Sequence, residues 1–295
     1  MDSPGDCLGI CFAGRQLFYA VNHPTDPSIL QHIGSIDYNF PLAGVLPDAE
    51  SDAFHGLAVS ITNLAEQYGC TTLRMLSPTR YECWSTFPRL VRETPDERED
   101  HLSILMDNVP RHQLETTWHE LSNRDYKLMM VRNRALTQNY RALSKGFSQS
   151  DFVSEFELGS EWHLHTGMKG SYLMIHAHNG TLVLSSYLLG TLRGATWLRY
   201  DDLNDLPYLW NYHARHLPWM NGFHEQVYLF GKSGLEVADI LSTFFNESGT
   251  ILLMNSLSDM QVDADEKTYG FRLESAFPAI LLSLNVHSNK AELQS

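Results

Sequence analysis

The sequence predicts a duplicated α/β fold, because one order of elements occurs twice along its 295 residues. In each copy, two extended segments are joined by a tight turn. A third extended segment, an amphipathic helix and a further strand follow. The first copy covers residues 7–76 and the second covers residues 171–230. Two units of this kind predict two lobes that face each other across a cleft.

The first copy combines apolar strands with one well-delimited helix. Its extended segments are residues 7–13, 16–21, 29–38 and 72–76, with Gly14-Arg15 as the first turn. Apolar residues on both faces are typical of strands covered on two sides. Apolar residues recur at helical spacing over 54–68. Ser51 or Asp52 is the expected cap, and Gly69 ends the helix.

The second copy repeats this order and is followed by three more elements. Its extended segments are 171–177, 181–187, 189–198 and 226–230, with Asn179-Gly180 as the turn and a helix over 202–215. Beyond it we expect a helix over 235–245, a strand over 250–254 and an apolar helix over 274–286.

Between the copies the sequence predicts a smaller group of elements. These are strands at 80–84, 116–121 and 127–131, and helices at 99–107 and 133–146. Residues 92–100 are the most charge-dense run, which we interpret as the solvated start of a helix rather than a docking segment.

Composition excludes several classes of protein. The chain has 21 Lys and Arg against 35 Asp and Glu, a net charge of -14, which argues against binding to nucleic acid or anionic lipid and favours protein partners. No apolar run approaches the roughly 20 residues of a membrane helix. The N-terminus lacks a signal-peptide pattern, so we expect a cytoplasmic protein without direct membrane insertion. The cysteines, at 7, 11, 70 and 83, lack CxxC spacing and are expected to be buried apolar residues.

Two motifs suggest chemistry that their surroundings do not support. Gly231-Lys232-Ser233 lacks the earlier glycine of a phosphate-binding P-loop, since Gln226 stands in its place. Histidines cluster at 163, 165, 176, 178, 213, 216 and 224. The pairs 163/165 and 176/178 are expected on strand faces and 213/216 on a helix face. This spacing can present metal ligands, but no carboxylate pattern accompanies them. We therefore predict no metal site and no catalytic residue, with His176 and His178 as the candidate metal ligands.

Three segments carry a resemblance to a known family. In residues 9–15 and 174–181 a strand runs into a glycine turn, and in residues 227–234 an apolar strand ends at Gly231 and Gly234. This order resembles the actin-like ATPase superfamily, in particular PilM-type pilus assembly proteins and their uncharacterised relatives. The first two segments match the family's phosphate loops, of the form D-x-G-x-[ST]. Cys11 lies near the first aspartate position, and His176 falls at the second.

The resemblance implies a duplicated ribonuclease H-like fold, with two lobes around a cleft and a small inserted subdomain. The first lobe would comprise residues 1–160, with the insertion at about 96–128, and the second residues 161–295. The matching positions of a degenerate nucleotide cleft are Gly14, His176, Gly180, Thr181, Gly231 and Gly234.

The departures from the motif decide the expected function. Actin-like ATPases hold hydrated magnesium through loop carboxylates, and neutral Cys11 and His176 cannot supply them. We therefore predict a non-catalytic scaffold that binds protein partners, by analogy in a membrane-associated assembly of pilus or secretion type, with no cofactor. One alternative is a nucleotide-binding protein or weak ATPase that retains ATP. Another is a metal-dependent enzyme that uses the histidine cluster. The sequence does not predict an oligomeric state.

Overall fold

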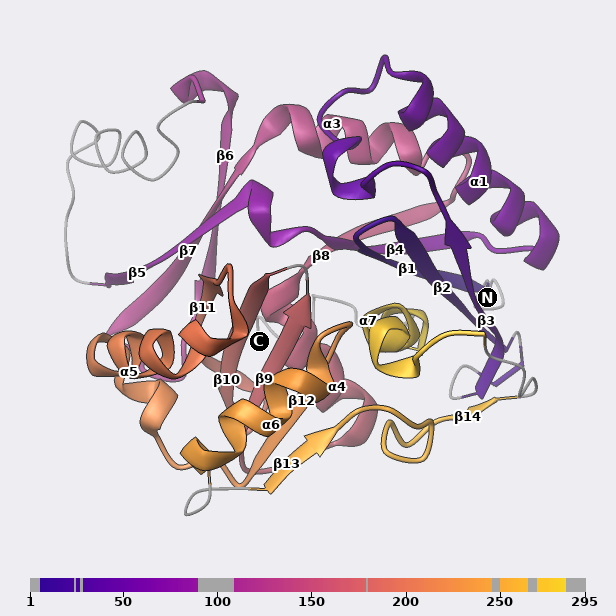
Figure 1. Ribbon diagram of the computed structural model, residues 1–295. Helices are drawn as coiled ribbons and strands as arrows, with labels where there is room; N and C mark the ends of the chain where they lie inside the picture. The colour runs from indigo at the N-terminus through magenta and orange to yellow at the C-terminus, as the bar shows by residue number, and fades with distance from the viewer. Residues whose placement is uncertain are drawn as a thin grey trace.

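The computed structural model describes residues 6–23, 25–26, 29–89, 109–178, 180–245, 250–264 and 270–284. Within them the strands form three sheets, two of which face each other with helices on their outer sides (Figure 1). The predicted helix at 99–107, the charged run at 92–100 and Asn179 lie outside the described residues.

The first sheet contains six strands in the order β14-β3-β2-β1-β4-β8. Their bounds are β1 (Cys7–Ala13), β2 (Gln16–Asn22), β3 (Ile29–Asp37), β4 (Thr72–Ser77), β8 (Gln149–Ser154) and β14 (Asp263–Ala264). Strands β1 and β2 form an antiparallel hairpin, whereas β1, β4 and β8 run parallel. Gly14 makes the hairpin turn with φ of 65°. β1 and β4 are buried along their whole length, as expected of central strands.

Two helices cover the outer face of this sheet. Helix α1 (Asp52–Tyr68) begins where Ser51 Oγ accepts a hydrogen bond from the Phe54 amide at 3.2 Å, and it ends at Gly69 with φ of 70°. Helix α3 (Arg134–Leu143) is capped by Asn133, whose side-chain oxygen accepts from the Ala135 amide. Their apolar faces form one cluster with alternate residues of the sheet.

The second sheet has five strands in the order β11-β10-β9-β12-β13. The bounds are β9 (Ser171–His178), β10 (Thr181–Leu188), β11 (Thr191–Arg199), β12 (Gln226–Phe230) and β13 (Thr250–Leu253). Helices α5 (Leu206–His216) and α6 (Gly234–Phe245) cover one face, where Trp210, Val237 and Leu241 are buried against the strands. The second copy of the predicted repeat is thus present.

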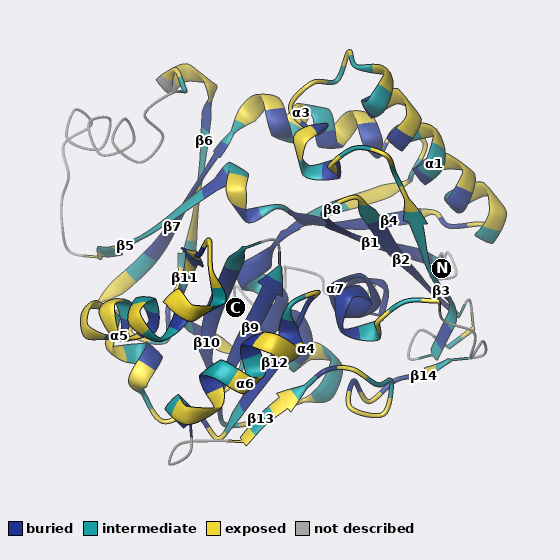
Figure 2. Ribbon diagram, in the orientation of Figure 1, coloured by how far each residue is buried: buried dark blue, intermediate teal, exposed yellow. Residues whose placement is uncertain are grey.

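Helix α7 (Leu273–Leu284) lies between the two main sheets and is buried from Glu274 to Leu284 (Figure 2). Its residues share one cluster with Phe18 of the first sheet and Phe230 of the second. Gly9 on β1 permits this contact, since a Cβ there would lie 2.1 Å from the Ala279 carbonyl oxygen. Helix α7 therefore contributes to a core that both lobes share.

Pairing and packing join parts of the predicted second lobe to the first sheet. β14 pairs with β3, and α7 packs on β1 and β2. Helix α4 (Leu158–Thr166) spans the predicted boundary at residue 160. The division of the chain at that residue remains a prediction.

A third, antiparallel sheet has the order β5-β7-β6. Its strands are β5 (Glu82–Pro88), β6 (Leu114–Glu120) and β7 (Tyr126–Asn133), close to the three strands predicted between the copies.

The expectation that His163 and His165 lie on a strand is wrong, because both belong to helix α4. Ser154 and Glu157 form a capping box that starts a helical turn, and Gly167 ends the helix with φ of 64°. The other pairs lie where predicted, His176 and His178 on β9 and His213 and His216 on α5. Among the described residues, no helix is long and apolar enough to cross a membrane.

Candidate functional site

A short segment at the end of β8, residues 154–157, positions the candidate site. It consists of Ser154 and the 3-10 turn Glu155–Glu157 and leads directly into α4. The Glu157 carboxylate accepts a hydrogen bond from the Ser154 amide at 2.9 Å, which fixes the turn. Because β8 lies parallel to β4, the segment lies at the carboxyl edge of the first sheet, a common place for ligand sites in α/β proteins.

Glu155 connects this edge to the second sheet. One carboxylate oxygen, Oε2, lies 2.8 Å from Nδ1 of His176 and 3.0 Å from Nε2 of His178. The other oxygen accepts a hydrogen bond from the Thr79 amide at 3.2 Å. The Glu155 side chain is only 2% exposed, and the imidazole rings lie 4.2 Å apart. The two histidines therefore converge on a single buried carboxylate oxygen.

The electrostatics of this cluster favour an ionised carboxylate. Burial alone would raise the pKa of Glu155, but the charges and hydrogen bonds of His178 and His176 hold it well below its usual range. Burial, with the charge of His178, lowers the pKa of His176 to about 4. Burial also opposes the charge on His178, but Glu155 outweighs it and raises that pKa. The buried carboxylate is thus kept ionised between the two rings, and a proton is favoured on His178 rather than on His176.

A cavity of about 570 Å³ adjoins this cluster. Its lining includes the first hairpin turn, residues that flank the second, two cationic side chains and part of the cluster: Gly14, Arg80, Glu155, His178, Thr181 and Arg199. Among the described lining residues, Glu155 is the only carboxylate, and both of its oxygens already accept hydrogen bonds. The cavity is therefore of mixed character, with apolar side chains such as Phe12 and Trp197 beside the two arginines.

The structure brings together only part of the predicted nucleotide cleft. Gly14 and Thr181 line the cavity, and Gly180 makes the second turn with φ of 72°. His176 lies behind the cavity, stacked on Phe230 at 4.8 Å. Gly231 borders that ring, since a Cβ there would lie 2.7 Å from a carbon of His176.

Gly234 begins helix α6, and neither it nor Gly231 is among the residues that line the cavity. Residues 227–234, the third segment that carries the resemblance, therefore pack against His176 and do not form part of the cavity wall.

Neither of the positions that the resemblance assigns to a family aspartate carries a carboxylate. Cys11 lies under α7 with its thiol 3.6 Å from the Ser275 carbonyl oxygen, and burial raises its pKa to about 12. A neutral buried thiol is not a ligand for magnesium, which prefers oxygen donors. His176, at the second predicted family position, lies 2.8 Å from the Glu155 carboxylate through Nδ1.

Sequence reasoning missed Glu155, Arg80 and Arg199. A signal for Glu155 existed, since Ser154 and Glu157 have the S-x-x-E spacing of a capping box and mark the end of a strand. Arg80 and Arg199 lie near the ends of elements without a motif, so only the fold places them at the cavity.

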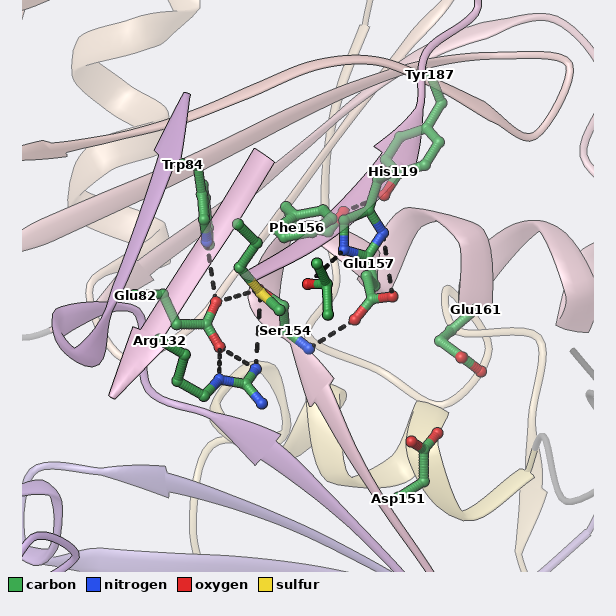
Figure 3. Close-up of polar contacts among 12 residues, drawn as sticks. Glu82, Trp84, His119, Arg132, Asp151, Ser154, Phe156, Glu157, Glu161 and Tyr187 are labelled. Carbon is green, nitrogen blue, oxygen red and sulfur yellow. Dashed lines mark hydrogen bonds and ion pairs between the residues drawn. The ribbon is translucent and has the colours of Figure 1, made fainter. Parts of the chain in front are cut away.

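On its other side, the segment 154–157 contacts the third sheet (Figure 3). Ser154 Oγ donates a hydrogen bond to the buried Glu82 carboxylate of β5. The same carboxylate accepts from Trp84 Nε1 at 2.9 Å and from Arg132 Nε of β7 at 3.0 Å. This network, together with Glu155, makes residues 154–157 a junction of all three sheets.

Comparison with known proteins bears on the fold. No protein-family model and no curated protein matches the sequence. Among solved structures, the PilM–PilN type IV pilus biogenesis complex contains a chain with a TM-score of 0.65 and 13% identity, over 95% of this chain and 98% of that one.

A Bacteroides thetaiotaomicron protein with an actin-like ATPase fold and unknown function gives a TM-score of 0.52 at 15% identity, over 88% of this chain and 97% of that one. The strand orders, the two hairpins and these matches agree with one another. The chain has the actin-like ATPase fold, in the two-lobed ribonuclease H-like arrangement that the resemblance implies.

Proposed function

We propose that this protein is a non-catalytic, actin-like subunit that binds protein partners in a membrane-associated assembly of pilus or secretion type. One observation carries the proposal. The two positions that match the family's metal-holding aspartates contain a buried neutral thiol, Cys11, and a histidine, His176, already bonded to Glu155. Hydrolysis of ATP by this fold depends on magnesium and its carboxylate anchors, so a role in binding is favoured over a role in catalysis.

The similarity to PilM supports the choice of partner class. The structure that contains PilM is a complex of two proteins, and its PilM-like chain covers almost the same length as this one. The net charge of -14 favours a partner with a basic segment. We therefore expect an association that weakens as the salt concentration rises.

Two measurements test this proposal. The purified chain should show no turnover of ATP with magnesium, and in-cell crosslinking followed by affinity purification should recover one partner in stoichiometric amount. A matched variant, Thr181→Val, separates weak activity from contamination, since Thr181 lines the cavity. Turnover that disappears in this variant would overturn the proposal. So would a chain that is recovered without any partner.

A second candidate is a nucleotide-binding protein that does not hydrolyse its ligand. Arg80, Arg199 and Thr181 in a cavity of about 570 Å³ favour it, because arginine binds phosphate oxygens well. Calorimetry with ATP and magnesium at millimolar concentration distinguishes this candidate. Binding that weakens at least tenfold in Arg199→Gln supports it, and absence of heat for the native chain eliminates it.

A further inference from the structure

We propose that Glu155, His176 and His178 bind one divalent metal ion of the zinc class, and that this ion joins the first sheet to the second. The three residues each offer a donor atom, and these atoms lie within 4.8 Å of one another. They come from separate parts of the fold, Glu155 from the end of β8 and the histidines from β9. The site is distinct from the proposed partner binding and does not depend on it.

The geometry requires little movement to accept an ion. The two histidine nitrogens lie 2.8 and 3.0 Å from the same carboxylate oxygen. A tetrahedral zinc ion with bonds of about 2.0 to 2.1 Å holds its donor atoms roughly 3.3 Å apart. A shift of a few tenths of an ångström away from Glu155 therefore brings both histidine–carboxylate distances to this spacing. Glu155 and His176 are buried and the His178 side chain is only 12% exposed, which restricts larger movements.

The donor set selects the class of metal. Imidazole nitrogens with one carboxylate suit zinc and neighbouring transition metals, whereas magnesium and calcium prefer oxygen donors throughout. Two histidines and one glutamate leave at least one coordination position free. Glu155 and His178 line the cavity, so this free position faces it and takes a water molecule.

The cluster without an ion is incompletely satisfied. His178 uses Nε2 toward Glu155, and its Nδ1 is buried without a hydrogen-bond partner in the described part of the chain. A buried nitrogen without a partner is costly.

The experiment uses the whole chain, stripped with a chelator and titrated with zinc in competition with a chromophoric chelator. We expect one zinc per chain with submicromolar affinity. Cobalt substitution should give the intense visible absorption of a tetrahedral site. His178→Gln and Glu155→Gln should weaken binding at least 100-fold. His216→Gln is the matched control, because His216 is exposed on α5 and bonds only to the Tyr212 carbonyl among its described hydrogen bonds.

Three results would overturn the proposal. The first is a native chain that is folded by circular dichroism but binds neither zinc nor cobalt at tens of micromolar. The second is equal binding by the native chain and the two variants, which places the metal elsewhere. The third is a loss in His216→Gln as large as in His178→Gln. The cobalt spectrum of the native chain decides the question even if a variant fails to fold.

Discussion

Glu82 and Arg132 lie directly opposite each other on β5 and β7 and form a buried ion pair. Arg132 Nε lies 3.0 Å from a Glu82 oxygen, and the Glu82 side chain has no exposed surface. Burial alone would lower the pKa of Arg132, but the charge and hydrogen bonds of Glu82 outweigh it and raise that pKa. Arg132 thus stays charged although it is buried at the junction of the three sheets.

Replacement of Glu82 by glutamine should therefore destabilise the protein strongly. The change leaves the Arg132 guanidinium buried without its counter-charge, which costs about 3 to 5 kcal/mol of unfolding free energy. Urea denaturation of the native chain and of Glu82→Gln measures this loss of unfolding free energy. The control is Glu120→Gln, because Glu120 pairs with Arg89 and Lys127 at the surface and should contribute less than about 1 kcal/mol. Similar losses in both variants would contradict the role assigned to burial.

A methyl group at Gly9 should separate α7 from β1. The added Cβ would lie 2.1 Å from the Ala279 carbonyl oxygen and 2.7 Å from the Ser283 amide, both backbone atoms that cannot turn aside. We expect Gly9→Ala to lower the unfolding free energy by about 1 to 3 kcal/mol. Gly56→Ala, on the exposed face of α1 with open space around it, should raise it by about 0.5 to 1 kcal/mol. Thermal denaturation of both variants checks that the two changes in unfolding free energy have opposite signs.

The turn between β10 and β11 contains a strained leucine. Leu189 has φ of 52° and is 63% exposed, and Gly190 follows with φ of 77°. Since asparagine tolerates this left-handed backbone better than leucine, Leu189→Asn should raise the unfolding free energy by about 0.5 to 1 kcal/mol. Gly190→Ala should lower it, because its Cβ would lie 2.3 Å from the His163 ring. A stabilising effect of Gly190→Ala in chemical denaturation would refute this account.

The buried His224 should make stability depend on pH. Burial, opposed by the hydrogen bond to the Trp219 carbonyl, lowers the pKa of His224 to about 4 from 6.5. The unfolded chain binds this proton below pH 6.5, whereas the folded chain binds it only near pH 4. Stability is therefore complete above pH 6.5 and falls as the pH decreases toward 4, by about 2 kcal/mol between pH 7 and 5.

Denaturation of the native chain and His224→Gln at both pH values checks this prediction. The other histidines contribute equally to the two proteins, so the difference between the two pH slopes isolates His224. Equal slopes would show that His224 does not cause the loss.

Local signals in the sequence were sufficient for much of the fold. Gly14 and Gly180 mark the two hairpins because only a residue that tolerates positive φ suits those turns. The α1 helix was predictable because its cap, apolar spacing and terminal glycine agree. His163 and His165 were misassigned because their alternation resembles a strand, while the capping box just before them specifies a helix.

The candidate site was less predictable, because its residues meet through tertiary structure. Glu155 precedes His176 by 21 residues and reaches it only once β8 and β9 are placed in facing sheets. The packing of α7 on β1 could not be predicted for the same reason. Nothing in the sequence around Gly9 indicates that a helix from the far end of the chain contacts it.

The burial of α7 between the sheets has a consequence for biosynthesis. The Cys7 thiol lies 3.8 Å from the Leu282 carbonyl oxygen, across 275 positions of the chain. The inner face of the first sheet consequently stays uncovered on the ribosome until residues 273–284 emerge. Contacts of such long sequence separation slow folding, and exposed apolar strands promote aggregation meanwhile.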